Sequence, residues 1–167
     1  MSNGVSKTAT VHKLLPFLLP VSAALIIPGL LFLRFKNRFR KARVRVTLGS
    51  LFIGFGLFLM IWTVQLFRRI GKGTLAPWDP TQRLVIAGPY AHTRNPMIAG
   101  VLSVLVGEGI LCGSLAILAW AFLFFLINNM YFRLSEEPGL LKRFGDEYAT
   151  YRANVPMWRP RLKPWQG

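Results

Sequence analysis

The stretch 88–100 joins a basic, polar loop to an apolar run, and it reads Gly-Pro-Tyr-Ala-His-Thr-Arg-Asn-Pro-Met-Ile-Ala-Gly. Pro96 suits the first position of a helix with Asn95 as its cap, so Arg94 and Asn95 would lie at a helix N-terminus. Free backbone N–H groups and the positive end of the helix dipole favour a carboxylate or phosphate there. The alternative is a capped helix whose arginine contacts lipid headgroups.

Three acidic side chains could also take part in chemistry. Glu108 lies inside the apolar run that follows Pro96. An acid inside a membrane helix is a functional candidate, and the alternative is a neutral glutamate that holds helices together. Glu136 and Glu137 follow Asn129 and Arg133 at helical spacing, so these side chains can share one face. Such a face suits a cationic or hydroxyl-bearing ligand, and the alternative is a solvated helix cap.

The composition indicates a membrane protein. The chain has 167 residues, of which 53% are hydrophobic and only 16% charged, so it is more apolar than an ordinary soluble domain. Its net charge is +15, from 21 basic and 6 acidic residues. Because the basic residues lie between and beside long apolar runs, we expect them to meet anionic lipid and not nucleic acid. The single cysteine, Cys112, excludes an internal disulfide and a multi-cysteine metal site, and we expect no metal.

Four apolar runs are long enough, or nearly so, to cross a bilayer, and only the third carries a charged residue, Glu108. They cover residues 14–33, 46–67, 96–112 and 115–132. The sequence therefore predicts an all-α integral membrane bundle of about four transmembrane helices, with C-terminal interfacial helices. We expect one domain over residues 1–167. The pattern gives no indication of the oligomeric state.

Glycines and prolines inside these runs predict how the helices bend and pack. The first run contains several prolines, so we expect a kinked span. Gly49, Gly54 and Gly56 would allow close packing of the second run. Gly113-Ser114 joins the last two runs in a helical hairpin with a tight turn.

The polar segments predict the topology. Residues 68–94 form a long loop rich in turn residues, and we expect it to be ordered and functional. In the tail, 136–167, Phe144-Gly145 suggests a helix stop and Asp146 the cap of a new helix. Two hairpins place the N-terminus, this loop and the tail on one side. Seven basic residues in 34–45 leave 14 of the 21 on that side, which favours a cytoplasmic loop and tail.

Three motifs in order carry a family resemblance. They are Gly71-Lys72-Gly73-Thr74, Gly88-Pro89-Tyr90 with Arg94-Asn95-Pro96-Met97 and Gly100, and Glu136-Glu137-Pro138 with Phe144-Gly145, Tyr148, Tyr151 and Val155-Pro156. Together they resemble the isoprenylcysteine carboxyl methyltransferase and phospholipid methyltransferase family of integral membrane enzymes. The resemblance covers roughly residues 71–160, and it extends more distantly to membrane sterol reductases that use NADPH.

The resemblance implies S-adenosylmethionine as the cofactor, bound at the cytosolic end of the bundle. The implied cofactor-binding residues are Gly71, Gly73, Tyr90, Arg94, Asn95, Pro96, Met97, Gly100, Glu136 and Glu137. With the intramembrane acid added, the expected catalytic residues are Arg94, Asn95 and Glu108. The chain departs from the family pattern at Asn95, where a histidine is common, and at Ile98, where a tyrosine is common. Asparagine can hydrogen-bond a carboxylate but cannot act as a base near neutral pH.

The expected reaction is methyl transfer to a lipid-like or isoprenylcysteine-type carboxylate acceptor. Such a displacement needs donor and acceptor held in line and water kept out. The acceptor would enter laterally from the membrane, and the cofactor from water. The alternatives are a phospholipid N-methyltransferase, an NADPH-dependent reductase of related fold, and a non-enzymatic lipid-binding membrane protein. The chain lacks the G-x-G-x-x-G fingerprint of dinucleotide binding.

Overall fold

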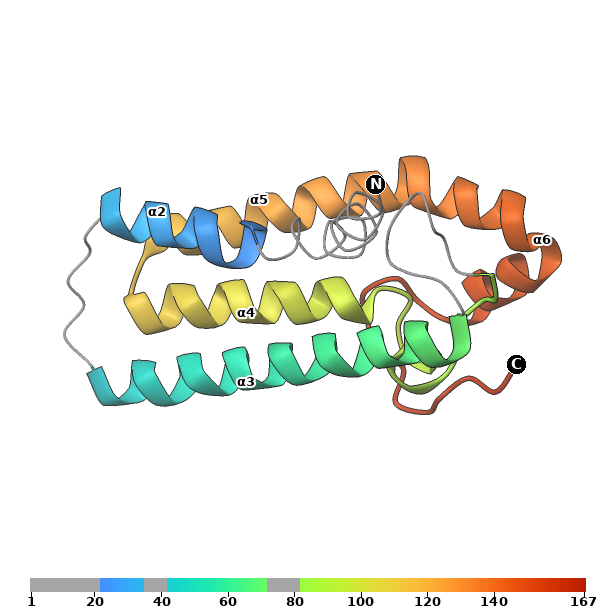
Figure 1. The fold of residues 1–167 in the computed structure, drawn as a ribbon, viewed down its shortest axis with the longest axis horizontal. Coiled ribbons are helices and arrows are strands. Elements are labelled where there is room, and N and C mark those ends of the chain that lie inside the picture. The colour runs from blue at the N-terminus through green and yellow to red at the C-terminus, as the bar shows by residue number, and fades with distance from the viewer. Residues whose placement is uncertain (1–21, 35–41, 72–81) are drawn as a thin grey trace, which may run out of the picture.

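The computed structural model describes residues 22–34, 42–71 and 82–167, and these form helices joined by turns and extended loops with no β-strand among them (Figure 1). The α-helices are α2 (Ile27–Arg34), α3 (Ala42–Leu66), α4 (Pro96–Cys112), α5 (Leu115–Tyr131) and α6 (Glu137–Asn154). Short π-helical or 3-10 turns, η1 (Ser22–Ile26), η2 (Phe67–Gly71), η3 (Gly88–Ala91) and η4 (Phe132–Glu136), precede or follow them. The predicted all-α class is confirmed.

Two helical stretches, Arg43–Gly71 and Leu115–Asn154, are long and apolar enough to cross a membrane, and α4 is a shorter apolar helix. Large apolar side chains on α3 and α5 face outward, among them Phe55 and Phe122, as expected of helices that contact lipid. The predicted runs 96–112 and 115–132 agree with α4 and α5, and 46–67 lies within α3 and η2. Of the predicted run 14–33, residues 14–21 lie outside the described residues.

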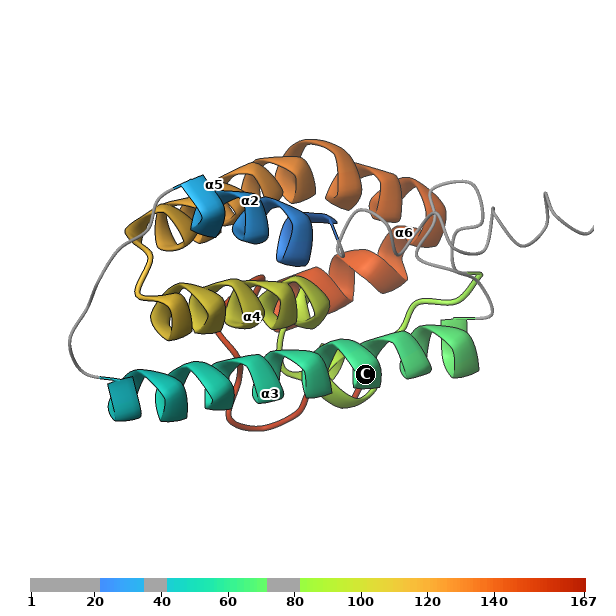
Figure 2. The same cartoon turned by 60° about the vertical axis from the view of Figure 1, so that its left-hand side comes forward.

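The helices form a bundle in which α4 lies between α3 and α5, while α2 lies against α4 and α5 (Figures 1 and 2). Consecutive long helices run antiparallel, so the end of α3, the loop before α4, and α6 gather at one end of the bundle. The predicted hairpin turn is confirmed. Gly113 adopts a left-handed conformation with φ 60°, and the Ser114 hydroxyl accepts a hydrogen bond from the Ile117 N–H, which satisfies both helix ends.

Glycines bring α3 and α4 together. A Cβ on Gly56 would lie 2.5 Å from the carbonyl oxygen of Gly100, and a Cβ on Gly49 would lie 2.8 Å from that of Gly107. The Ser103 hydroxyl also donates to the Phe52 carbonyl at 2.8 Å. The predicted packing role holds for Gly49 and Gly56. At Gly54 a Cβ would meet nothing within 4 Å among the described residues, so no close packing is seen there.

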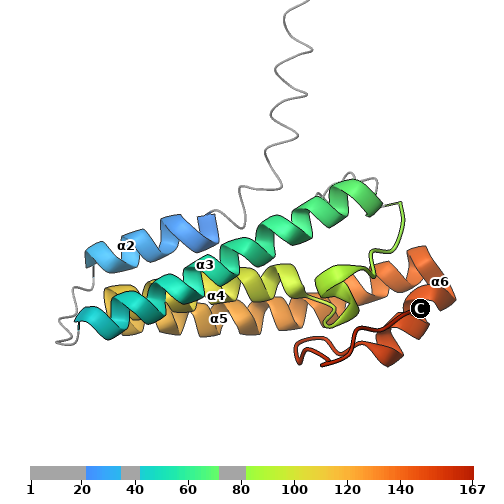
Figure 3. The same cartoon turned by 90° about the horizontal axis from the view of Figure 1, so that it is seen from below.

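In the C-terminal third the helix extends beyond the last apolar run. It continues from α5 through η4 into α6, in keeping with the helical spacing of Asn129, Arg133 and the two glutamates. α6 consists of two helical arms that meet at Gly145, whose φ of 54° and ψ of −128° lie outside the helical region. The predicted break is therefore correct in position. After Asn154 the tail turns back toward the bundle (Figure 3).

Candidate functional site

An ion pair links the loop before α4 to the start of α6. Arg94 and Glu137 have side chains only 12% and 7% exposed, and Nη1 of Arg94 donates to Oε1 of Glu137. Nε of Arg152 lies 3.3 Å from the second oxygen, Oε2. Because α5, η4 and α6 form one continuous helix, Glu137 is carried from the bundle to the loop of Arg94. Each oxygen of this buried carboxylate thus faces an arginine.

Two tyrosines of α6, Tyr148 and Tyr151, lie beside the ion pair, and Tyr151 is bonded to a third, Tyr90. The Tyr151 hydroxyl donates to the Tyr90 carbonyl at 2.7 Å, and Tyr148 and Tyr151 pack in one buried apolar cluster with Val155. Burial raises the pKa of Tyr90 and of Tyr151. Burial and the Glu137 charge raise the pKa of Tyr148, against the opposing effect of the neighbouring Arg94 guanidinium. These side chains are therefore neutral phenols near a charged pair.

Arg94 keeps one unused donor. Its Nε atom is buried and has no hydrogen-bond partner among the described residues. A buried donor without a partner costs about 1–3 kcal/mol. Arginine presents its N–H groups in a planar fork that matches a carboxylate or phosphate. The orphaned Nε therefore suits an anionic group of a ligand.

The residues after Arg94 begin α4 as predicted, with one correction. Asn95 occupies the N-cap position and Pro96 follows it, but the Asn95 side chain makes no capping hydrogen bond. Its amide is thus not engaged with the helix end. The predicted position of the cap is right, and the predicted capping bond is wrong.

The two adjacent glutamates have different partners. Glu137 joins the arginines, whereas Oε2 of Glu136 accepts from the Tyr131 hydroxyl at 3.3 Å. Asn129, which was expected to share a face with these acids, accepts a hydrogen bond from Trp158 Nε1 at 2.9 Å. Asn129, Glu136 and Glu137 therefore contact different partners and do not form one common binding face.

Glu108 lies far from this cluster. Glu108 lies about 18 Å from Pro96 along the axis of α4, at the usual helical rise per residue. Its Oε2 is buried and has no hydrogen-bond partner among the described residues. The structure therefore does not bring Glu108 to Arg94, although both were expected in the catalytic site.

The glycines expected around the cofactor lie in different parts of the structure. Gly71 is buried at the end of η2, and its carbonyl accepts from the Gln82 N–H at 2.8 Å. Gly73 lies outside the described residues. Gly100 packs against Gly56 of α3. Met97 lies on the first turn of α4, close to Arg94 in the chain.

The tail holds the loop of Arg94 in place, a contact that the sequence did not predict. The Arg94 N–H donates to the Pro156 carbonyl at 3.0 Å, and the Thr93 hydroxyl donates to the Met157 carbonyl at 2.8 Å. The Arg161 N–H donates to the His92 carbonyl at 2.9 Å, and His92 Nδ1 lies 2.7 Å from the Arg161 carbonyl. Because a carbonyl only accepts, Nδ1 must carry a proton.

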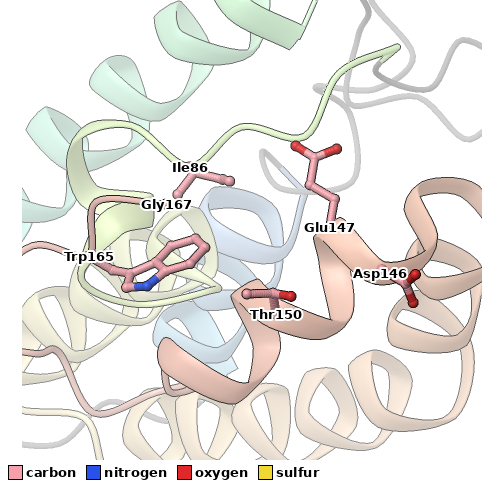
Figure 4. Close-up of a pocket in the computed structure, with 6 residues that line it drawn as sticks. All are labelled: Ile86, Asp146, Glu147, Thr150, Trp165 and Gly167. Atoms are coloured by element: carbon pink, nitrogen blue, oxygen red, sulfur yellow. The ribbon is translucent and has the colours of Figure 1, made fainter.

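A cavity of about 380 Å³ adjoins the cluster between α6 and the tail. Figure 4 shows Trp165 and Ile86 on one side of it and Glu147 and Thr150 of α6 on the other. The ring of Trp165 also packs against Tyr151, with centroids 5.7 Å apart. The complete lining is Ile86, Asp146, Glu147, Thr150, Trp165 and Gly167. Its size is at the lower end for small-molecule sites, so it would hold part of a larger ligand.

The sequence did not predict the role of Arg152 or the contacts of the tail. Arg152 follows Tyr148 by four residues, which places the two on one helix face, so this spacing was the available signal. The tail bonds to the loop mainly through backbone groups, which leave no side-chain pattern.

Comparison with known proteins relates the chain to a family of membrane enzymes. The family model described as phospholipid methyltransferase matches residues 44–147. This range contains nearly all of α3, the whole of α4 and α5, the first part of α6, and both Arg94 and Glu137. No curated protein and no solved structure matches the chain.

Proposed function

Because the chain belongs to the phospholipid methyltransferase family, we propose that it transfers a methyl group from S-adenosylmethionine to a lipid-like acceptor, with the cofactor held at the Arg94–Glu137 cluster. The observation that carries this proposal is the buried Nε of Arg94, which has no partner among the described residues. The residues fit the cofactor, because its carboxylate would satisfy that donor.

The residues of the chain have distinct roles in this proposal. Arg94 and the free N–H groups at the start of α4 bind the carboxylate. The Asn95 amide makes no capping bond and adds a donor. Glu136, beside Glu137, takes the ammonium or a ribose hydroxyl. When bound, S-adenosylmethionine supplies a methyl group on a positively charged sulfur, and the buried tyrosines exclude water from that region.

The electrostatics of the cluster support an acceptor that needs no base. Glu137 is held by two arginines, and Glu136 accepts from Tyr131. In the described part of the cluster neither carboxylate is placed to take a proton from a substrate. A carboxylate acceptor is already a nucleophile, whereas an amine must first be deprotonated. We therefore propose a lipid-like or isoprenylcysteine-type carboxylate, and the family description favours a phospholipid amine as the second candidate.

The same arrangement supports a multi-pass topology in one domain over residues 1–167. The loop of Arg94, α6 and the tail lie at one end of the bundle (Figure 1). We propose that this end is cytoplasmic, so that the cofactor arrives from water and the acceptor from lipid.

Binding and transfer assays test the proposal. Calorimetric titration of the protein in detergent should detect S-adenosylmethionine and not NADPH, and Arg94→Gln should lose that binding. The labelled methyl group should then appear in membrane lipid or protein extracts. Alkali separates the two acceptors, because a methyl ester releases methanol whereas an N-methyl group stays attached. Binding of NADPH alone would support the reductase, and binding of neither would support a lipid-binding protein.

A further inference from the structure

We propose that residues 158–163 of the tail form an anchor that contacts the anionic headgroup region of the bilayer. This surface lies outside the cofactor site, and its role does not depend on methyl transfer. It rests on three features: Trp158 packs on a membrane-crossing helix, Leu162 faces outward, and basic residues flank Leu162.

Trp158 fixes the tail against the end of α5. Its Nε1 donates to Asn129 Oδ1 at 2.9 Å. Its ring meets Phe125 edge-on at 5.1 Å and Phe132 at 6.0 Å between centroids. Phe125 and Phe132 are seven residues apart, or about 10 Å along the helix. The tail therefore covers roughly the last two turns of the apolar part of this helix.

The same part of α5 carries exposed apolar side chains beside the covered strip. Phe122, Leu126 and Met130 are 64%, 39% and 60% exposed. On a helix long and apolar enough to cross a membrane, such side chains face lipid. Trp158 thus lies at the level where the bilayer interior meets the headgroups, where tryptophan is enriched in membrane proteins.

Leu162 is the most exposed large apolar residue of the described chain, at 100%. Its position is held on both sides. Arg161 exchanges hydrogen bonds with His92, and the Trp165 N–H donates to the Ala91 carbonyl at 3.0 Å. A leucine held outward next to a lipid-facing helix would insert between lipid headgroups.

The positive charge of residues 158–163 favours contact with anionic lipid. Arg159 and Lys163 are exposed, and no acidic residue occurs in 148–167. Arg161 is partly buried and donates to the Asn154 carbonyl at 2.6 Å, so Arg159 and Lys163 supply the outward charge. Lysine and arginine near an anionic membrane surface are attracted to it. The alternation of tryptophan, leucine and basic residues thus fits a bilayer surface.

A depth measurement tests the anchor. Cys112 is the only cysteine, so Leu162→Cys in a Cys112→Ala background places one polarity-sensitive fluorophore on the segment. The protein is studied in nanodiscs with brominated lipids, with and without phosphatidylglycerol. We expect quenching by lipids brominated near the glycerol end. We also expect stronger quenching with phosphatidylglycerol than with phosphatidylcholine alone, and loss of that difference in high salt or in Arg159→Gln/Lys163→Gln.

A label at Phe122→Cys, on the outward face of α5, is the matched reference for lipid contact. Quenching at Phe122 without quenching at Leu162 would overturn the proposal, because the tail would then face water or a partner protein. Equal quenching of Leu162 in both lipids would overturn the role of anionic headgroups. A spin label at the same position gives a second depth measurement. Neither assay uses cofactor or acceptor, so failure here leaves the proposed methyl transfer untouched.

Discussion

Gly56 of α3 and Gly100 of α4 lie so close that a Cβ on Gly56 would be 2.5 Å from the Gly100 carbonyl oxygen. We therefore expect Gly56→Ala to separate the helices and destabilise the protein by about 1–3 kcal/mol, the usual cost of overpacking. Thermal unfolding in one detergent measures this cost.

Gly54→Ala is the matched control, because a Cβ there meets nothing within 4 Å in the part of the chain that the structure describes. It should leave stability unchanged or raise it by up to about 1 kcal/mol through helix propensity. Equal losses in Gly54→Ala and Gly56→Ala would show that the close approach of α3 to α4 does not limit stability.

Glu137→Gln and Glu136→Gln should differ in their effects on stability. Removing the charge of Glu137 leaves Arg94 buried beside a neutral amide, and breaking a buried pair costs about 3–5 kcal/mol. Glu136 is bonded to the exposed Tyr131, so its substitution should cost little. We expect both variants to bind S-adenosylmethionine more weakly. Unfolding curves and calorimetric titration of both variants test this, and unchanged affinity in both would leave the acids with a structural role alone.

Asn95→His should retain or improve methyl transfer. The substitution restores the residue that the resembled family commonly has, and histidine also offers a donor to a carboxylate. Because the Asn95 side chain makes no capping bond, helix α4 loses no such bond. Initial rates and unfolding temperatures of the two proteins give the comparison. A folded but inactive variant would mean that this position takes part in a different chemistry.

Glu108→Gln should be tolerated, and Glu108→Leu should disturb packing. Burial of Oε2 without a described partner favours an uncharged polar group. The distance of about 18 Å from Pro96 along α4 predicts unchanged cofactor affinity in both variants. The measurements are thermal stability, cofactor affinity and turnover in one detergent. Lost turnover in the Gln variant at unchanged stability would make Glu108 a catalytic or acceptor-binding residue.

Tyr151→Phe should reduce the sensitivity of the fold to alkali. Burial raises the pKa of Tyr151 above its ordinary value of 10.0. The neutral phenol therefore stabilises the fold fully below pH 10, and this stabilisation is lost as the pH rises above that value. The variant loses the bond to the Tyr90 carbonyl, at about 1 kcal/mol near neutral pH. Unfolding curves from neutral pH to above pH 10 should converge for the two proteins, and parallel curves would contradict this.

The helices were predictable where the sequence has unbroken apolar runs with clear ends. Pro96 marks the start of α4, and Gly113-Ser114 marks the turn into α5. For the helix through η4 the helical spacing of Asn129, Arg133 and Glu136 was the available signal, because the polar Ser135-Glu136-Glu137 run by itself resembles a helix end. Which glycine of α3 faces its neighbour was hidden, since a helix that is apolar on all sides shows no preferred face.

The candidate site was predicted as a set of residues and not as a set of contacts. Arg94 and Glu137 were expected together through motifs that a family resemblance connects. Their mutual ion pair depends on the continuous helix that carries Glu137 to the loop of Arg94, and the contact of the second arginine, Arg152, depends on how α6 folds back after Gly145. The hydrogen bonds from the tail to the loop use the backbone carbonyls of Pro156 and Met157. Any residue type has such a carbonyl, so the sequence gives no sign of these bonds.

The bonds between the tail and the loop of Arg94 have a consequence for biosynthesis. The partners that residues 91–94 have in the tail lie at positions 156–165, so the ribosome makes them after both arms of the α4–α5 hairpin. A nascent chain that ends before residue 156 would contain Arg94 and Glu137 but not the segment that fixes the loop between them. The final shape of this loop is therefore acquired late in translation, once most of the apolar helices have been made.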